Sequence, residues 1–189
     1  MTVKTLYDRL SERIPEELRE EWDNDGLMCS SDDQKEVKRA LVTLDVTEDI
    51  VDYAVSHNID LIVSHHPLIF KPLKSVTEDS HVARKVIKLI KNDISVMSFH
   101  TRADKVEGGV NDLLADILGI KNAVPFGEGF LGRIGYNVMA EAGEMGINLI
   151  EAGHFFTEQP VTQFFQTLLH RLDPSMYIEI MDSNVIKLI

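Results

Sequence analysis

The chain has 189 residues, of which 44% are hydrophobic and 26% charged, a composition typical of a globular protein with one large or two small domains. Its formal net charge of −12 argues against nonspecific binding to nucleic acid or to an anionic membrane, and would attract cations instead. No stretch resembles a signal peptide or a transmembrane helix, and the single cysteine, Cys29, excludes an internal disulfide. We therefore expect a cytoplasmic protein.

Hydrophobic spacing predicts alternating helices and strands over the first two thirds of the chain. An opening helix, broken or kinked near Pro15, leads into the turn-rich segment "WDNDGLMCSSDD". Three strand–helix pairs follow, with Thr47 and Ser80 as helix N-caps and Gly119 as a helix stop. In chain order they are "RALVTLD", "VTEDIVDYAVSHN", "DLIV", "SHVARKVIKLIKND", "ISVMSF" and "GGVNDLLADILGI". This alternation indicates an α/β fold with a mostly parallel sheet flanked by helices.

The rest of the chain is shorter. Residues 124–135 are rich in glycine and are predicted to form a linker, so we expect a first α/β half over 1–123 and a second over 136–189. The second half should contain a helix near 136–145, the strand "INLIEA", a further helix, and a terminal hairpin of "MYIEIMD" and "NVIKLI".

Two adjacent histidines follow an aliphatic run in "DLIVSHHPLIF". The run suits a strand covered on both faces, so His65 and His66 should lie at its carboxyl end, where open α/β sheets usually bind ligands. Neighbouring strand residues point in opposite directions, so the backbone must turn between Ser64 and Pro67 for both rings to converge. The structural alternative is a polar strand end, with one histidine capping a backbone group and the other in solvent.

Two segments repeat one histidine–carboxylate spacing. "ISVMSFHTRAD" ends with His100 and Asp104, and "INLIEAGHFFTE" ends with His154 and Glu158. Each places a histidine after a short aliphatic strand and an acid four residues later. A second alignment, of "IDLIVSHH" with "INLIEAGH", pairs the last histidine of each instead. We prefer the first alignment because it also matches the carboxylate, and both alignments indicate one strand-end geometry that is used more than once.

Thr157 and Pro160 predict where the helix after the second motif begins. Thr157 is a suitable N-cap, and Pro160 would lie in the first turn, where a missing N–H costs little. His154 would then lie in a strand-to-helix loop and Glu158 at the helix start.

Imidazoles and carboxylates that converge at strand ends suit a divalent transition metal. Imidazole favours zinc, iron, nickel or copper, and carboxylates extend the range toward manganese. Three histidines and two acids would crowd one ion, whereas two ions about 3.5–4 Å apart, bridged by a carboxylate and a water, would use the set naturally. Each residue alone has a structural alternative: Asp104 could cap the turn before "GGVND", and Glu158 could favour a helix N-terminus.

Other candidate sites have weaker signals. Cys29 has no histidine partner in the sequence, and "GEGFLG" lacks the lysine and preceding strand of a phosphate loop. A phenylalanine cluster favours core or interface over base stacking, because no basic residues interleave with Phe155, Phe156, Phe164 and Phe165.

Several motifs together resemble the Nif-three-like family, whose bacterial members are often labelled GTP cyclohydrolase I type 2. In chain order they are "EEWDNDGLMC", "LDVT", "DLIVSHHP", "HTRAD" followed by "GGVND", "LGRIG" and "AGHFFTE". The resemblance runs from Trp22 to Glu158. One departure is a shortened second half, because Gly135 runs almost directly into "YNVMAEAGEMGINLI", without the additional strand and loop of the family.

The resemblance implies a dinuclear metal protein that assembles as a ring-shaped homohexamer. The family's ligands carry over onto His65, His66, Asp104, His154 and Glu158. His100 matches a family position that is not usually a direct ligand, so we expect it to orient a ligand or a bound water.

We therefore predict two divalent ions per chain, zinc, iron or manganese, in a metal-dependent hydrolase acting on a nucleotide-like small molecule. His100 is the candidate for proton transfer. The alternative is a non-catalytic metal-binding or scaffold protein. Nearby basic residues would either bind substrate phosphates or form solvated surface charges: Lys71, Lys74, Arg102 and Lys105.

Overall fold

The structure is a computed structural model that describes residues 1–121 and 153–184. The predicted linker at 124–135, the helix near 136–145, the strand "INLIEA" and the last strand beyond Asn184 fall outside the described residues. Helices that are long and apolar enough to span a membrane do not occur in the two described ranges.

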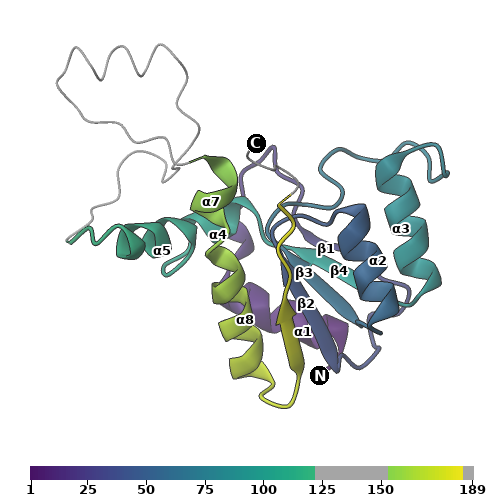
Figure 1. The fold of residues 1–189 in the computed structure, drawn as a ribbon, viewed down its shortest axis with the longest axis horizontal. Helices are drawn as coiled ribbons and strands as arrows, with labels where there is room; N and C mark the ends of the chain where they lie inside the picture. The colour runs from purple at the N-terminus through teal and green to yellow at the C-terminus, as the bar shows by residue number, and fades with distance from the viewer. Residues whose placement is uncertain (122–152, 185–189) are drawn as a thin grey trace, which may run out of the picture.

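Five strands form one sheet in the order β1-β4-β3-β2-β5 (Figure 1). The four strands from β4 to β5 are parallel to their neighbours, and β1 pairs antiparallel with β4 at one edge. The predicted mostly parallel sheet is confirmed. The strand bounds are β1 Gly26–Cys29, β2 Arg39–Thr43, β3 Leu61–Ser64, β4 Ser95–Ser98 and β5 Tyr177–Ile180.

The edge strand β1 was predicted as part of a turn-rich segment, and that prediction is wrong. The turn formers Asn24 and Asp25 do precede it, and its first residue, Gly26, has a φ of +122°, which favours glycine. The strand is only four residues long and its register with β4 shifts between Leu27 and Cys29. So short and irregular a strand has little periodicity of its own, and its pairing with β4 decides its conformation.

Helices cover both faces of the sheet (Figure 1). α1 and α8 pack in the core cluster on one face, whereas α2 and α3 pack in the cluster on the other. The side chains of Thr47 and Ser80 accept hydrogen bonds from Ile50 N and Ala83 N, so both predicted N-caps are confirmed. The main helices are α1 Val3–Arg13, α2 Glu48–Ser56, α3 His81–Lys91, α5 Val110–Ile117 and α8 Val161–Leu172.

Three short helices complete the described part of the chain. A 3-10 helix, η1 (Glu16–Leu18), follows Pro15, so the predicted break of the opening helix is confirmed. α4 (Thr101–Lys105) follows β4, and α7 (His154–Glu158) precedes α8. Both short helices carry residues of the repeated histidine–carboxylate motif.

The central strands are buried on both faces. In β3, Leu61 and Val63 belong to the cluster with α1 and α8, whereas Ile62 belongs to the cluster with α2 and α3. All three have 0% exposure. Burial of such a side chain typically stabilises a fold by about 1.5–3 kcal/mol. This double burial explains why the strand reads as a continuous aliphatic run.

The described end of the chain joins the same sheet. β5 lies parallel to β2, with Ile178 opposite Ala40, and the strand predicted in "MYIEIMD" is confirmed. From α8, Phe165 and Leu169 enter the core cluster that contains α1. The strand order therefore brings α7, just before α8, to the end of the sheet that carries the histidine pair.

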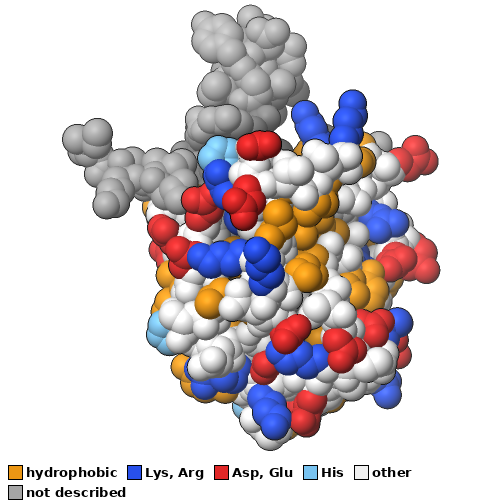
Figure 2. All heavy atoms as spheres, turned by 90° about the vertical axis from the view of Figure 1, so that its right-hand side faces the viewer, with side chains coloured by type: hydrophobic (Ala, Val, Ile, Leu, Met, Phe, Trp, Pro, Cys, Tyr) orange, Lys and Arg blue, Asp and Glu red, His pale blue; other side chains and the backbone are white. Residues whose placement is uncertain are grey.

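The face that carries α2 and α3 mixes charges of both signs (Figure 2). Arg84 pairs with Glu48 at 3.2 Å, and Lys88 pairs with Asp52. Basic side chains described on this face are interspersed with acidic ones rather than gathered into a stripe of the kind that binds nucleic acid.

We expect Gly109→Ala to destabilise the turn between α4 and α5. A Cβ at Gly109 would lie 2.1 Å from the Ala103 carbonyl oxygen, so the helices must separate. Chemical denaturation should show a loss of about 3 kcal/mol in the free energy of unfolding, the upper end of the range typical of overpacked sites. Gly119→Ala is the matched control, because its φ of +68° gives strain of about 1 kcal/mol but none of the described residues comes within 4 Å of the added Cβ. Equal losses would contradict the close approach at Gly109.

Candidate metal centre

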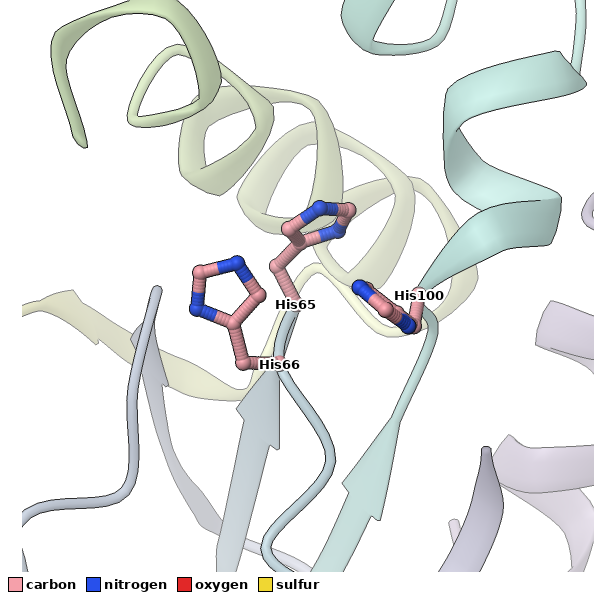
Figure 3. A group of neighbouring side chains, drawn as sticks. All are labelled: His65, His66 and His100. Carbon is pink, nitrogen blue, oxygen red and sulfur yellow. The ribbon is translucent and has the colours of Figure 1, made fainter. Parts of the chain in front are cut away.

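Three histidine rings meet at the carboxyl ends of β3 and β4 (Figure 3). The ring centroids of His65 and His66 are 5.0 Å apart, and the ring centroid of His100 lies 5.3 Å from that of His65 and 5.6 Å from that of His66. The chain turns as expected: the Ser64 hydroxyl donates to the His66 carbonyl oxygen at 2.9 Å. The structure therefore brings both adjacent histidines to one place.

His65 is fully buried, and one of its nitrogens is free to bind a ligand. Nδ1 lies 3.0 Å from the Phe99 carbonyl oxygen. Since a carbonyl only accepts, Nδ1 carries the proton and Nε2 keeps a lone pair. Within the described chain this Nε2 has no hydrogen-bond partner. Burial, and then the charges of His66 and His100, lower the pKa of His65 well below its usual value, so the ring is neutral, as metal binding requires.

His66 lies between two carboxylates. Its Nδ1 is 2.7 Å from Asp45 Oδ1, and its Nε2 is 2.9 Å from Glu158 Oε2. Burial disfavours the charged ring, but these hydrogen bonds outweigh it and raise the pKa of His66 to about 9. The protonated ring therefore holds Glu158 in place without a metal. Asp45 orients the ring in the way that carboxylates orient metal-binding histidines, a role the sequence did not suggest.

His100 precedes α4 and forms a dyad with Asp23. Its Nδ1 lies 2.9 Å from Asp23 Oδ1, while Asp23 Oδ2 accepts from the Thr101 amide and hydroxyl at 3.1 and 2.7 Å. Burial would raise the pKa of Asp23, but the hydrogen bonds from His100 and Thr101 outweigh it and lower the pKa to about 2. The ionised Asp23 thus fixes the ring, another role that the sequence did not suggest.

Asp104 is held close to the histidines with little exposure to solvent. Its Oδ1 lies 3.5 Å from His65 Nε2, and its side chain is 13% exposed. Burial and then the charge of Glu158 raise the pKa of Asp104 to about 7. A cation between Asp104 and Glu158 would offset the repulsion between their negative charges.

α7 carries His154 and Glu158, and here the predicted helix start is wrong. α7 begins at His154, after Gly153 with a φ of +74°, and Thr157 lies inside it. The Thr157 hydroxyl donates to the carbonyl oxygens of Gly153 and His154, so it does not act as an N-cap. Pro160 precedes α8 instead. His154 and Glu158 therefore lie four apart on one helix face, and His154 Nε2 is 3.1 Å from Glu158 Oε2.

All five predicted ligands and His100 fall into overlapping groups of three. In each group the nitrogen and oxygen ligand atoms lie within 4.8 Å of one another. Glu158 belongs to two groups, so it connects the side chains on either side of it. The groups are His65 with His66 and His100, His66 with His154 and Glu158, and His65 with Asp104 and Glu158. Imidazole and carboxylate donors at this spacing can bind a divalent metal ion.

A cavity of about 430 Å³ opens beside these groups. It is lined by Leu44, Asp45, His66, Pro67, Phe70, His100, His154, Phe155, Ser183 and Asn184. Arg102 was predicted either to bind substrate phosphates or to be a solvated surface charge. It does neither, because it is fully buried against Asp25. Lys105 pairs with Glu20, whereas Lys71 and Lys74 are exposed. None of these basic residues is among the described residues that line the cavity, which include neither lysine nor arginine.

Sequence comparison assigns the chain to a known protein family. The family described as Duf34/NIF3 (NGG1p interacting factor 3) matches residues 1–136. The chain belongs to the DUF34/NIF3 family. This confirms the resemblance drawn from the motifs, and the match includes His65, His66, His100 and Asp104. Residues 154 and 158 lie beyond the matched range, so their place beside the other four rests on the structure.

Relatives in the DUF34/NIF3 family bear the name that the motifs suggested. A protein of Clostridium perfringens named "GTP cyclohydrolase 1 type 2 homolog" is 39% identical over 124 residues, covering 66% of this chain and 47% of its own length. A homolog of the same name from Bacillus subtilis is 42% identical over 113 residues, covering 60% and 29%. The chain thus spans half or less of the length of these two relatives.

Two solved structures show how far the fold extends. A Bacillus cereus protein related to NIF3 has 39% identity and a TM-score of 0.60, covering 65% of this chain and 34% of its own. Reduced HcgD from Methanocaldococcus jannaschii has a TM-score of 0.80 and covers 95% of this chain and 97% of its own. Its identity is only 20%, so it supports the fold alone.

Proposed function

We propose that this DUF34/NIF3 protein binds two divalent metal ions and uses them to hydrolyse a nucleotide-like substrate. The observation that carries the proposal is the position of Glu158 Oε2. It lies 2.9 Å from His66 Nε2 and 3.1 Å from His154 Nε2 on one side, and 3.9 Å from His65 Nε2 on the other. One carboxylate serving two sets of ligands is the arrangement of a bridged two-metal centre.

The ligands divide into two sets that share Glu158. His65 and Asp104 would hold one ion with Glu158, and His66 and His154 would hold the other. His65 Nε2, which has no hydrogen-bond partner among the described residues, and the largely buried Asp104 both favour an ion in the first set. Zinc, iron and manganese all accept these donors. When bound, two such ions polarise a substrate oxygen and lower the pKa of a water to supply the attacking nucleophile.

His100 is the group placed to move protons. The Nδ1–H of His100 donates a hydrogen bond to the Asp23 carboxylate, so Nε2 carries a lone pair. This nitrogen can accept a proton from a water or a substrate in the cavity that His100 lines. The side chain is 17% exposed, enough for contact with a substrate. Asp23 acts through His100 by fixing its tautomer and orientation.

The test combines metal content with turnover. Protein purified without chelator should contain about two equivalents of zinc, iron or manganese by elemental analysis, since the donor set suits two ions. His66→Ala should lower this content. His100→Gln should retain the metal but lower GTP hydrolysis by about 10²–10⁴-fold, the usual loss of a general base. Absence of metal, before and after addition of these ions, would refute the proposal.

One observation favours a second function, metal binding without catalysis. His154, a candidate ligand, is 61% exposed, which would let an ion exchange readily with solvent. A metal-replete protein that hydrolyses no nucleotide and transfers its metal to an apo-acceptor would support this alternative.

The assembly and location of the protein also belong to the proposal. By resemblance we propose a homohexamer, which light scattering after size-exclusion chromatography would test, and a location in the cytoplasm.

A further inference from the structure

The cavity beside the candidate metal centre has a polar and an apolar part. Histidines of the centre supply polar groups on one side, whereas Leu44, Pro67, Phe70 and Phe155 supply apolar surface. Lysine and arginine are absent from its described lining. The described lining is otherwise uncharged apart from Asp45 and the histidines, so a ligand held against Leu44, Pro67, Phe70 and Phe155 is bound through apolar contact.

Two large aromatic rings beside the cavity are exposed: Phe70 lines the cavity, and Trp22 packs edge-on against Phe70. Trp22 is 60% exposed and Phe70 is 45% exposed, although most large apolar side chains of the described chain are buried. With His100 they form three edge-on pairs, each with ring centroids 6.2 Å apart and with interplanar angles of 68°, 79° and 88°. In edge-to-face packing the rim of one ring lies against a face of its neighbour. Phe70 nevertheless keeps 45% of its surface exposed and lines the cavity, so part of its ring is accessible to a ligand there.

The segments that carry these rings are fixed to each other. The Asn24 side-chain amide donates to the Ile69 carbonyl oxygen, which joins the neighbours of Trp22 and Phe70. Asp23, next to Trp22, is held by His100 as described above. The aromatic surface is therefore built in advance, which reduces the entropy lost when a ligand binds.

The shape of this surface selects one class of occupant. Of these three rings only Phe70 and His100 line the cavity. A quaternary ammonium group is bound by a cage of several aromatic faces, which Phe70 alone does not supply. An open aromatic face instead accepts a flat ring by stacking, and the cavity volume of about 430 Å³ lies in the range typical of small-molecule sites.

We propose that Phe70, supported edge-on by Trp22, is the stacking face for a planar heteroaromatic ring, and that this ring is the part of the substrate that the protein recognises. This deepens the proposed function and rests on it for the role of the metals. It assigns Phe70 to substrate binding and makes a nucleobase or nucleoside, rather than a phosphate chain, the minimal ligand.

Trp22 is the only tryptophan in the chain, so its fluorescence reports this surface directly. We expect guanosine and GTP to quench it saturably in the zinc-loaded protein, with comparable affinities, after correction with N-acetyltryptophanamide. Tripolyphosphate, which lacks a ring, should not. Phe70→Ala should weaken the binding of both ligands by about 5- to 150-fold, the usual effect of losing one base–aromatic stack, while Phe70→Tyr retains binding.

Phe156→Ala is the matched control, because Phe156 is 59% exposed but does not line the cavity. It should leave the quenching unchanged. Elemental analysis of the same samples separates the two proposals. Quenching by guanosine without bound metal supports the ring site and refutes the metal-dependent function. Bound metal with no quenching by either ring compound, or quenching by tripolyphosphate alone, overturns the ring site, and an aromatic surface that docks another protein would then remain.

Discussion

In the proposed two-metal centre, Glu158→Gln should remove both ions, whereas substitutions at the other proposed ligands should each remove one. Glutamine keeps the shape of the side chain but loses the negative charge that the two proposed ligand sets share. Outer-shell partners typically change metal affinity by 10–100-fold, and the loss of a shared ligand should exceed about 100-fold. Elemental analysis after dialysis should therefore show well under one equivalent of metal per chain.

The pattern across three variants carries more information than a single loss. Asp104 Oδ1 is 3.5 Å from His65 Nε2 and belongs only to that group, so Asp104→Asn should leave the second ion in place. His154→Ala should leave the first ion in place for the same reason. Equal metal contents in all three variants would argue against two separate sites.

Two checks exclude trivial explanations for this pattern. Glu48→Gln is a matched control, because Glu48 Oε1 also approaches a histidine, His81 Nδ1 at 3.5 Å, but on the exposed surface of α2. It should retain the full metal content. Circular dichroism should show that each variant is folded, since the core clusters do not include Asp104, His154 or Glu158. Retention of metal by Glu158→Gln would contradict the bridging role.

The parts of the fold that the sequence predicted are those where burial or capping acts locally. The aliphatic run of β3 is continuous because both faces of the strand are covered, and Thr47 and Ser80 cap helices within three residues. β1 was missed because its pairing with β4 comes from a distant segment. Thr157 was misplaced because a threonine hydroxyl can cap a helix or return to carbonyls inside it, and the sequence does not distinguish the two.

The candidate site divides in the same way. The histidines and acids were found because strand ends and repeated spacing are visible in the sequence. The groups that orient them were not, since Asp45 lies 21 residues from His66 and Asp23 lies 77 residues from His100. Only the order of the strands brings such pairs together. The acid at the end of "RALVTLD" was a usable signal for Asp45, because carboxyl ends of parallel strands meet at one edge.

Asp25→Ala should be among the most destabilising substitutions in the described chain. Asp25 Oδ2 accepts from Arg102 Nε at 2.9 Å and from the His100 amide at 3.1 Å, and both charged side chains have 0% exposure. Arg102 also donates to the Ile14 carbonyl oxygen at 3.1 Å and lies over the Phe99 ring at 4.5 Å. Without Asp25 the guanidinium stays buried with no carboxylate partner of its own, at a cost of about 3–5 kcal/mol.

The ion pair itself should contribute much less than this loss. Burial raises the pKa of Asp25 despite the opposing charge of Arg102, so desolvation offsets much of the attraction between them. A double variant, Asp25→Leu with Arg102→Met, should therefore be more stable than Asp25→Ala alone in urea denaturation. Because Asp25 also accepts a hydrogen bond from the His100 amide, the double variant should loosen the turn that carries His100. It should therefore slow the proposed hydrolysis without lowering the metal content. Equal destabilisation of the single and double variants would contradict this expectation. It would show that the attraction between Asp25 and Arg102, and not the cost of leaving Arg102 buried without its carboxylate, determines the stability of this region.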